Sequence, residues 1–284
     1  MALSCVPVVD KKGRGLGVVT EEDLRLALCG NGRPHHAITT LLTHPHEATL
    51  IGPPPRAVTV DRALVMAGGR GSRLRPLTDS IPKPLLDVGG EPLLHRLLRQ
   101  VAAAGITRCA ISVLYLGSRI EADIGDGSRF GLEISYLRET DPLGTAGALG
   151  QLEEAPPSSA TLVMNGDVYH DVNLRALFAW HERHGNRVTV ATHLHEVHVP
   201  FGLAHFEGQR LDHLEEKPTL RLPVNAGIYV IDERLRRDVP KAEPWDMVDW
   251  LNTLAPAGVV GHFPIVERWH DIGSLTEYER LRDG

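Results

Sequence analysis

A glycine-rich segment directly after a short apolar run constrains this chain more than any other feature of its sequence. Residues 64–67 are Leu-Val-Met-Ala, and three glycines follow within four positions, at Gly68, Gly69 and Gly71. Because glycine has no side chain, such a segment lets the backbone approach a polyphosphate closely. Cationic side chains lie among and after these glycines, at Arg70, Arg73, Arg75 and Lys83. The segment therefore predicts a phosphate-binding loop.

Two better-known glycine loops do not fit this segment. A dinucleotide-binding loop needs a glycine three positions after Gly71, where this chain has Leu74, and it opens directly into a helix. Prolines forbid such a helix here, at Pro76, Pro82 and Pro84. A Walker loop ends in Gly-Lys-Ser/Thr, whereas Gly71 is followed by Ser72 and Arg73. A turn without a ligand stays the alternative for the glycines alone, and the nearby cations disfavour it.

The segment also carries a longer pattern. Residues 68–74 read Gly-Gly-x-Gly-Ser-Arg-Leu, and residues 82–84 read Pro-Lys-Pro. This pattern resembles the signature of the sugar-1-phosphate nucleotidyltransferases, and the resemblance extends from about residue 63 to the C-terminus. It implies that Arg73 and Lys83 are catalytic. It also implies that one group of loop residues binds the nucleotide: Ala67, Gly68, Gly69, Gly71 and Ser72.

Composition narrows the class of protein. The chain has 284 residues, of which 42% are hydrophobic and 23% are charged, as in ordinary soluble globular proteins. It shows neither an apolar run as long as a membrane span nor the regions of a signal peptide, so we expect a cytoplasmic protein. Three cysteines without a Cys-x-x-Cys pair argue against a disulfide framework or a zinc ribbon. A net charge of -6 argues against general nucleic-acid binding.

The N-terminal sequence differs from the rest. Residues 6–10 and 15–20 predict a β-hairpin, and residues 21–29 predict a helix that Thr20 caps and Gly30 ends. This order resembles the latter half of a CBS repeat, in which a Gly-x-Val-Thr-x-x-Asp segment contacts adenine nucleotides in some family members.

In this chain the residues that match the CBS segment are Thr20 and Asp23. The opening helix and strand of the repeat are missing, and residues 35–50 would be only the start of a second repeat. Two interpretations therefore stay open, a regulatory ligand site and a structural or dimerising remnant.

A proline-rich spacer marks the clearest boundary. Residues 52–56 read Gly-Pro-Pro-Pro-Arg, which is typical of a stiff, exposed connection. We therefore expect a partial CBS-like segment at residues 1–51, a linker at residues 52–61 and a nucleotidyltransferase domain at residues 62–284.

Beyond the spacer, patterns typical of strands and helices alternate. Strands are predicted at residues 63–66, 107–113, 132–136 and 161–164, and helices at residues 91–105, 145–152, 173–184 and 245–254. Such alternation favours a largely parallel sheet covered on both faces, with ligands bound beyond the C-terminal strand ends. The predicted fold class is α/β: a Rossmann-like three-layer α/β/α domain with a mostly parallel mixed sheet, plus a small N-terminal α+β segment.

Two acidic residues are candidate metal ligands. Asp167 follows a predicted strand within Asn-Gly-Asp, a tripeptide that is more often merely a turn. Asp271 lies in Trp-His-Asp-Ile-Gly, which resembles the family's Trp-x-Asp-Ile-Gly segment, although Asp271 alone is as well suited to cap a helix at residues 274–282. A carboxylate pair suits Mg2+, which takes its other ligands from water and substrate phosphates. The resemblance implies that Asp167 and Asp271 hold Mg2+.

A run of small residues is the candidate nucleotide-base site. Residues 143–148 read Leu-Gly-Thr-Ala-Gly-Ala and resemble the family segment that packs against the base and ribose. Gly144, Thr145 and Arg138 are the nucleotide-binding residues that the resemblance implies, and Glu139 stands beside them at the expected base edge. Close helix packing is the alternative reason for small residues here. The sequence does not fix the base.

Short runs in which apolar and polar residues alternate begin at residue 188 and predict a second, more antiparallel patch that carries the sugar-facing residues. These runs cover residues 188–192, 203–206, 211–215 and 226–231. Segments here resemble the family's Glu-x-Lys-Pro and Asn-x-Gly motifs, although an exposed Glu-Lys pair is also a common surface feature. The sugar-phosphate-binding residues implied by the resemblance are Asn165, Gly202, Glu216, Lys217, Asn225 and Gly227.

The resemblance implies attack by a sugar-1-phosphate oxygen on the α-phosphorus of a nucleoside triphosphate, which gives a nucleotide sugar and pyrophosphate. The preceding CBS-like segment resembles a bacterial branch that loads guanine nucleotides onto mannose-, heptose- or glucosamine-type phosphates. We therefore expect GTP, with dTTP, UTP and CTP as alternatives. A catalytically silent regulator that binds a nucleotide or nucleotide sugar is the other class. Neither nucleic acid nor membrane is an expected partner, and the sequence leaves open whether the chain forms a homo-oligomer.

Overall fold

The computed structural model describes residues 5–9, 15–20, 25, 58–241 and 243–282. The chain divides into two compact units. The larger unit contains the described residues of Ala48–Ala191, Ala226–Phe263 and Glu267–Gly284. The smaller unit contains those of Met1–Glu47, Thr192–Asn225 and Pro264–Val266. None of the described helices has the length and apolar character needed to cross a membrane.

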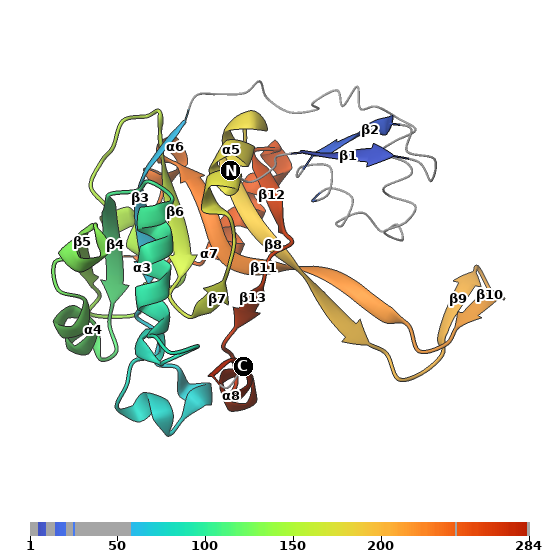
Figure 1. Cartoon of the computed structure of the whole chain (residues 1–284), viewed down its shortest axis with the longest axis horizontal. Coiled ribbons are helices and arrows are strands. Elements are labelled where there is room, and N and C mark those ends of the chain that lie inside the picture. The colour runs from blue at the N-terminus through green and yellow to red at the C-terminus, as the bar shows by residue number, and fades with distance from the viewer. Residues whose placement is uncertain (1–4, 10–14, 21–24, 26–57, 242, 283–284) are drawn as a thin grey trace. The chain divides into compact units, whose positions relative to one another are not determined.

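The largest sheet has seven strands in the order β12-β8-β11-β6-β3-β4-β5 (Figure 1). Its strands are β3 (Thr59–Met66), β4 (Arg108–Val113), β5 (Glu133–Arg138), β6 (Ser159–Asn165), β8 (Val188–His198), β11 (Thr219–Asp232) and β12 (Val260–Ile265). β3 is parallel to β4 and β6, β4 is parallel to β5, and β11 is antiparallel to β6. The predicted mixed, mostly parallel sheet is confirmed.

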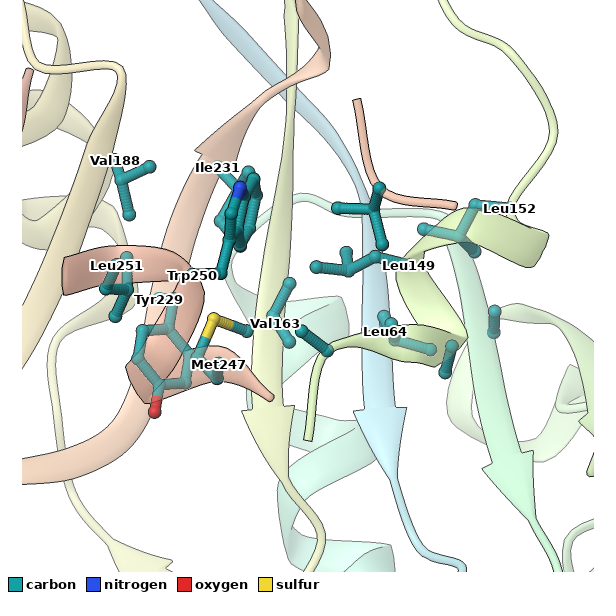
Figure 2. Close-up of a cluster of buried hydrophobic side chains, with 14 residues drawn as sticks. Leu64, Leu149, Leu152, Val163, Val188, Tyr229, Ile231, Met247, Trp250 and Leu251 are labelled. Atoms are coloured by element: carbon teal, nitrogen blue, oxygen red, sulfur yellow. The ribbon is translucent and has the colours of Figure 1, made fainter. Parts of the chain in front are cut away.

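The parallel strands are apolar because both faces of the sheet are covered. Leu64 and Val65, which point to opposite faces of β3, are both fully buried. Figure 2 shows one face, where Met247 and Trp250 of α7 (Met247–Leu254) lie in the same hydrophobic cluster as Leu64. On the other face, α3 (Leu93–Ala103) lies in front of the strands in Figure 1. Helices therefore cover both faces of the sheet, which gives the three layers of an α/β/α domain.

The remaining elements are short. The other described helices are α4 (Gly117–Ile124), α5 (Leu174–Arg183), α6 (Glu233–Arg236) and α8 (Leu275–Arg282). Smaller strands are β1 (Cys5–Val9), β2 (Gly15–Thr20), β7 (Val168–His170), β9 (Leu203–Glu207), β10 (Arg210–Glu215) and β13 (Trp269–Asp271). The 3-10 turns are η1 (Ser72–Leu74), η2 (Leu77–Asp79), η3 (Lys83–Leu85), η4 (Ser128–Phe130), η5 (Gly147–Gln151) and η6 (Ala255–Ala257).

Two expectations for the C-terminal half were wrong. The segment predicted as a helix at residues 145–152 forms the 3-10 turn η5, which contains Gly147 and Gly150. An ideal Cβ at Gly150 would lie 2.1 Å from the carbonyl oxygen of Pro240, so this turn packs directly against another backbone. The predicted second, more antiparallel patch is not one sheet, because β8 and β11 join the large sheet and β9 and β10 form a two-stranded sheet of their own. Its antiparallel pairing is confirmed, for β9 with β10 and for β11 with β6.

The N-terminal hairpin is confirmed, since β1 and β2 pair in antiparallel fashion. Of the helix predicted at residues 21–29, only Arg25 lies among the described residues; its guanidinium is buried and donates to the Pro264 carbonyl at 2.8 Å. Asp23, the second half of the predicted CBS-like segment and residues 52–57 of the predicted linker lie outside the described residues. The domain boundaries and the CBS-like assignment stay predictions.

Candidate active site

A cavity of about 430 Å3 opens at the C-terminal ends of β3, β4 and β6 in the larger unit. Parallel strands place the polar residues that follow them at one edge of the sheet, which is where the sequence pattern predicted the ligand. The cavity is lined by Met66, Ala67, Gly68, Gly69, Arg70, Gly71, Lys83, Pro84, Ser112, Leu114, Glu139, Pro142, Gly144, Thr145, Asn165 and Asp167.

The glycine loop has a fixed shape. Gly71 adopts the left-handed conformation, with φ of 59°, at the start of η1. The buried Thr78 hydroxyl donates to the Gly71 carbonyl at 2.9 Å. An ideal Cβ at Gly71 would lie 3.0 Å from Thr78 Cγ2 and 3.1 Å from Lys83 Cβ. Only glycine fits this position without moving its neighbours.

We expect Gly71→Ala to raise KM for the triphosphate by about tenfold, because a left-handed alanine costs roughly 1–2 kcal/mol and its Cβ presses on Thr78 and Lys83. Steady-state kinetics with variable triphosphate measure the change. Gly89→Ala is the matched control, because Gly89 has φ of 68°, open space around it and no place in the cavity lining. An unchanged KM in Gly71→Ala would show that the loop shape does not matter for binding.

Lys83 connects the loop to the two predicted metal ligands. Its side chain is only 8% exposed, and its Nζ lies 2.6 Å from Asp167 Oδ2. The same Nζ lies 3.8 Å from Asp271 Oδ1. The side chains of Asp167 and Asp271 are 36% and 47% exposed. A buried ammonium thus joins two carboxylates that remain open to water and ligand.

A short strand pair brings these two carboxylates together. β7 follows Asp167, β13 ends at Asp271, and the two strands pair antiparallel with Asp271 opposite Val168. Asp171, just beyond β7, accepts hydrogen bonds from Arg96 of α3 and from Arg268, which precedes β13. Burial would raise the pKa of Asp171, but the hydrogen bonds from Arg268 and Arg96 lower it overall. These two ion pairs connect both strands to α3.

The donor set fits Mg2+ and not an all-protein metal cage. Within the described ranges, no three His, Cys, Asp or Glu side chains gather where they could hold a metal ion. Mg2+ needs only one or two carboxylates, because water and substrate phosphates supply its remaining ligands. Asp167 and Asp271 meet that need. The alternative role of Asp271 as a helix cap is wrong, since the Ser274 hydroxyl accepts from the Glu277 N–H at the start of α8.

The small-residue segment forms another wall of the cavity, with Gly144 and Thr145 among the lining residues. Gly144 has φ of 74°, and an ideal Cβ there would lie 2.8 Å from the Trp245 carbonyl oxygen. The Thr145 hydroxyl donates to Asp246 at 3.0 Å and accepts from the Met247 N–H at 2.8 Å. The segment is therefore held against the N-terminus of α7.

Glu139 also lines the cavity, and hydrogen bonds from the protein hold both of its carboxylate oxygens. The buried Ser112 hydroxyl donates to its Oε1, and the Leu143 N–H donates to its Oε2 at 3.0 Å. Arg138, the neighbouring residue predicted to bind nucleotide, is not among the lining residues. Its guanidinium makes a bidentate pair with Glu121 of α4, at 2.7 Å for each bond.

The structure brings most of the predicted nucleotide and catalytic residues to one cavity. Of these, Ala67, Gly68, Gly69, Gly71, Lys83, Gly144 and Thr145 line it. The predicted sugar-phosphate residue Asn165 and the predicted metal ligand Asp167 line it as well. Ser72, Arg73 and Asp271 do not, although Arg73 Nη1 lies 3.4 Å from the ideal Cβ position of Gly273, close to Asp271. Ser112 also lines the cavity and was not predicted, although a polar residue at the end of an apolar strand is a signal that could have identified it.

The predicted sugar-phosphate residues fall in both units. In the larger unit, Gly227 has φ of 69°, and an ideal Cβ there would lie 2.4 Å from Asn165 Nδ2. In the smaller unit, an ideal Cβ at Gly202 would lie 3.3 Å from Glu216 Oε2. Lys217, also in the smaller unit, has φ of 47° and donates its N–H to the Phe201 carbonyl at 3.2 Å.

Asn225 ends the Thr192–Asn225 part of the smaller unit. Glu216 and Lys217 are both exposed, and their charged groups are 3.9 Å apart. The sugar-binding roles of all these residues stay predictions.

Comparison with known proteins adds independent support for the fold and the family. A family model described as "Nucleotidyl transferase" matches residues 62–283. A Mycobacterium tuberculosis protein named mannose-1-phosphate guanylyltransferase is 37% identical over 228 residues, which cover 77% of this chain and 62% of the relative. The chain thus spans less than two thirds of that relative's length.

Two solved structures share the fold. A Bacillus anthracis protein described as a glucose-1-phosphate thymidylyltransferase, in complex with sucrose, has a TM-score of 0.65 at 24% identity and covers 79% of this chain and 94% of its own. HddC from Yersinia pseudotuberculosis, complexed with GMP-PN, has a TM-score of 0.60 at 22% identity and covers 79% of this chain and 99% of its own. With its glycine loop, its paired carboxylates and the match over residues 62–283, the chain belongs to the nucleotidyl transferase family.

Proposed function

We propose that the chain transfers a nucleotidyl group from a nucleoside triphosphate to a sugar 1-phosphate, with release of pyrophosphate. The observation that carries the proposal is the cavity in which the glycine loop, Lys83 and Asp167 face one another. Family membership and the similarity to a mannose-1-phosphate guanylyltransferase support the same reaction. In the proposed organisation the domain at residues 62–284 carries this activity.

The reaction needs alignment and charge neutralisation more than proton transfer. A phosphate oxygen is already anionic and attacks without a general base. The loop backbone would receive the triphosphate, Arg73 would hold it, and Lys83 would steady the α-phosphate and the sugar phosphate as they meet. Asp167 and Asp271 would hold Mg2+, which supplies neutralisation of the phosphate charge when it is bound.

Glu139 supports guanine as the base. Glu139 lines the cavity, and each of its carboxylate oxygens is oriented by one donor from the protein and keeps a further lone pair to accept from a base. Guanine presents adjacent N1–H and N2–H donors, which match a carboxylate in bidentate fashion. Uracil and thymine present a single N–H between two carbonyl oxygens, and those oxygens would repel the carboxylate. We therefore propose GTP over dTTP and UTP.

A mannose-type phosphate is the proposed acceptor, because the Mycobacterium tuberculosis relative bears that name. Asn165 and Gly227 are in direct van der Waals reach of each other and form the proposed sugar-phosphate wall of the larger unit. For Gly202, Glu216, Lys217 and Asn225, which belong to the smaller unit, a sugar-phosphate-binding role rests on the sequence motifs alone.

A substrate panel tests the proposal. The protein is incubated with Mg2+, each of GTP, UTP, dTTP and CTP, and a set of hexose 1-phosphates, and the products are identified by mass. The expected product is a guanosine diphosphate sugar. Tight nucleotide binding without any product would instead favour a silent regulator.

A further inference from the structure

One oxygen of the predicted metal site already has a cation on it. Asp167 Oδ2 accepts a hydrogen bond from the Lys83 ammonium at 2.6 Å, and Asp271 Oδ1 lies 3.8 Å from the same nitrogen. Mg2+ contacts carboxylate oxygens at about 2.1 Å. An ion on Asp167 Oδ2 would therefore stand directly against the ammonium. The two cations compete for the same carboxylate charge.

We infer that Lys83 couples metal binding to triphosphate binding: it holds the two carboxylates until a triphosphate in the cavity gives its ammonium another anionic partner. This inference rests on the proposed function, because it assigns the metal to Asp167 and Asp271. It adds that Lys83 opposes metal binding to the free protein, in addition to its proposed contact with the phosphates.

Lys83 is placed so that its ammonium can contact either the two carboxylates or a triphosphate on the loop. Lys83 lines the cavity together with Gly69 and Gly71, so a triphosphate on the loop would lie beside the lysine side chain. The backbone of Lys83 belongs to η3, and a Cβ placed at Gly71 would lie 3.1 Å from Lys83 Cβ, so the base of the side chain is fixed against the loop. Only the flexible end of the side chain needs to change partner.

The coupling has a thermodynamic consequence. If a triphosphate removes the ammonium from Asp167, it strengthens metal binding, and metal must strengthen triphosphate binding by the same factor. The part of the coupling that passes through Lys83 should disappear when residue 83 carries no charge, and only the direct ligation of the metal by the phosphates should remain. A lysine that merely preorganised the carboxylates would have the opposite effect, because its loss would weaken metal binding.

The test measures Mn2+ binding to the full chain by electron paramagnetic resonance, first without nucleotide. Mn2+ prefers the same oxygen ligands as Mg2+. We expect Lys83→Met to lower the Kd for Mn2+ by about tenfold, which is within the usual range of couplings between two binding sites. Lys83→Arg keeps the charge and should bind Mn2+ within about twofold of the unmodified chain.

Arg75→Met is the matched control for removal of a nearby cation. Arg75 lies outside the cavity lining and pairs with Asp79, and its side chain is 55% exposed, so the Kd for Mn2+ should not change. Thermal unfolding verifies that each variant is folded, and Lys83→Gln replaces Lys83→Met if the latter does not fold. In the second step, a non-hydrolysable GTP analogue should strengthen Mn2+ binding to the unmodified chain by a larger factor than to Lys83→Met, because phosphate ligation of the metal is common to both chains and only the unmodified chain also releases Lys83 from Asp167.

Equal or weaker Mn2+ binding by the neutral variants overturns the coupling. This readout involves no turnover, so it separates the two proposals. Tighter Mn2+ binding by Lys83→Met in a protein that makes no nucleotide sugar would support the coupling and contradict the proposed reaction. Unchanged Mn2+ binding by Lys83→Met in a protein that makes nucleotide sugar would contradict the coupling and support the proposed reaction.

Discussion

Replacing Asp167 with asparagine is expected to lower kcat by two to three decades. Asparagine preserves the size of the side chain and removes the charge that faces both Lys83 and the proposed metal. Loss of one preorganised charge partner in an active site typically costs about 10²–10³ in rate. Lys83→Ala should have an effect of similar size, because the ammonium is the other member of the same pair. Rapid-quench or steady-state kinetics at saturating substrate measure both.

Asp79→Asn is a suitable control for the aspartate variant. Asp79 is an exposed partner of Arg75 at the end of η2 and does not line the cavity, so the kcat of Asp79→Asn should stay within about twofold of that of the unmodified chain. If Asp167→Asn and Lys83→Ala both turn over at near the unmodified rate, neither residue takes part in the mechanism.

Glu139→Gln should redirect base selection. Glutamine keeps the length of the side chain but replaces one acceptor oxygen with an NH2 donor, which faces the N1–H and N2–H donors of guanine unfavourably and suits a carbonyl of uracil or thymine. A bidentate base contact is worth about 1–3 kcal/mol of discrimination. We therefore expect the ratio of kcat/KM for GTP over UTP to fall by about 10²-fold. Competition between the two triphosphates, with both products quantified by mass, gives this ratio directly.

The control for this experiment is Glu133→Gln, an exposed residue of β5 outside the cavity. The GTP-to-UTP ratio of Glu133→Gln should match that of the unmodified chain. An unchanged ratio in Glu139→Gln would mean that another group recognises the base.

The strands that carry the cavity could be predicted from the sequence, because buried parallel strands are short apolar runs. β3, β4 and β6 each fall on such a run, and the helices α3 and α5 have clear starts, such as the Asn173 side chain that caps α5. α4 was not predicted, because it begins after Leu116 in a left-handed conformation, without a capping side chain. β7 and β13 are three residues long, too short to show a period.

Site residues could be predicted from the sequence where the functional side chains and the local backbone belong to the same motif. Gly71 and Lys83 belong to one continuous motif, and the structure places them side by side. The approach of Asp271 to Asp167 depends on the pairing of β7 with β13, which local sequence does not encode. The bidentate pair of Arg138 with Glu121 depends on α4 and could not be foreseen for the same reason.

The most direct test of nucleotidyl transfer by this chain follows the phosphorus atoms of the triphosphate. The protein is supplied with Mg2+, mannose 1-phosphate and GTP that is radiolabelled at either the α- or the γ-phosphate, and the labelled products are separated. The proposed reaction places the α-label in a guanosine diphosphate sugar and the γ-label in pyrophosphate, in equal amounts. Release of the γ-label as inorganic phosphate, or retention of both labels in GTP, would contradict nucleotidyl transfer by this chain.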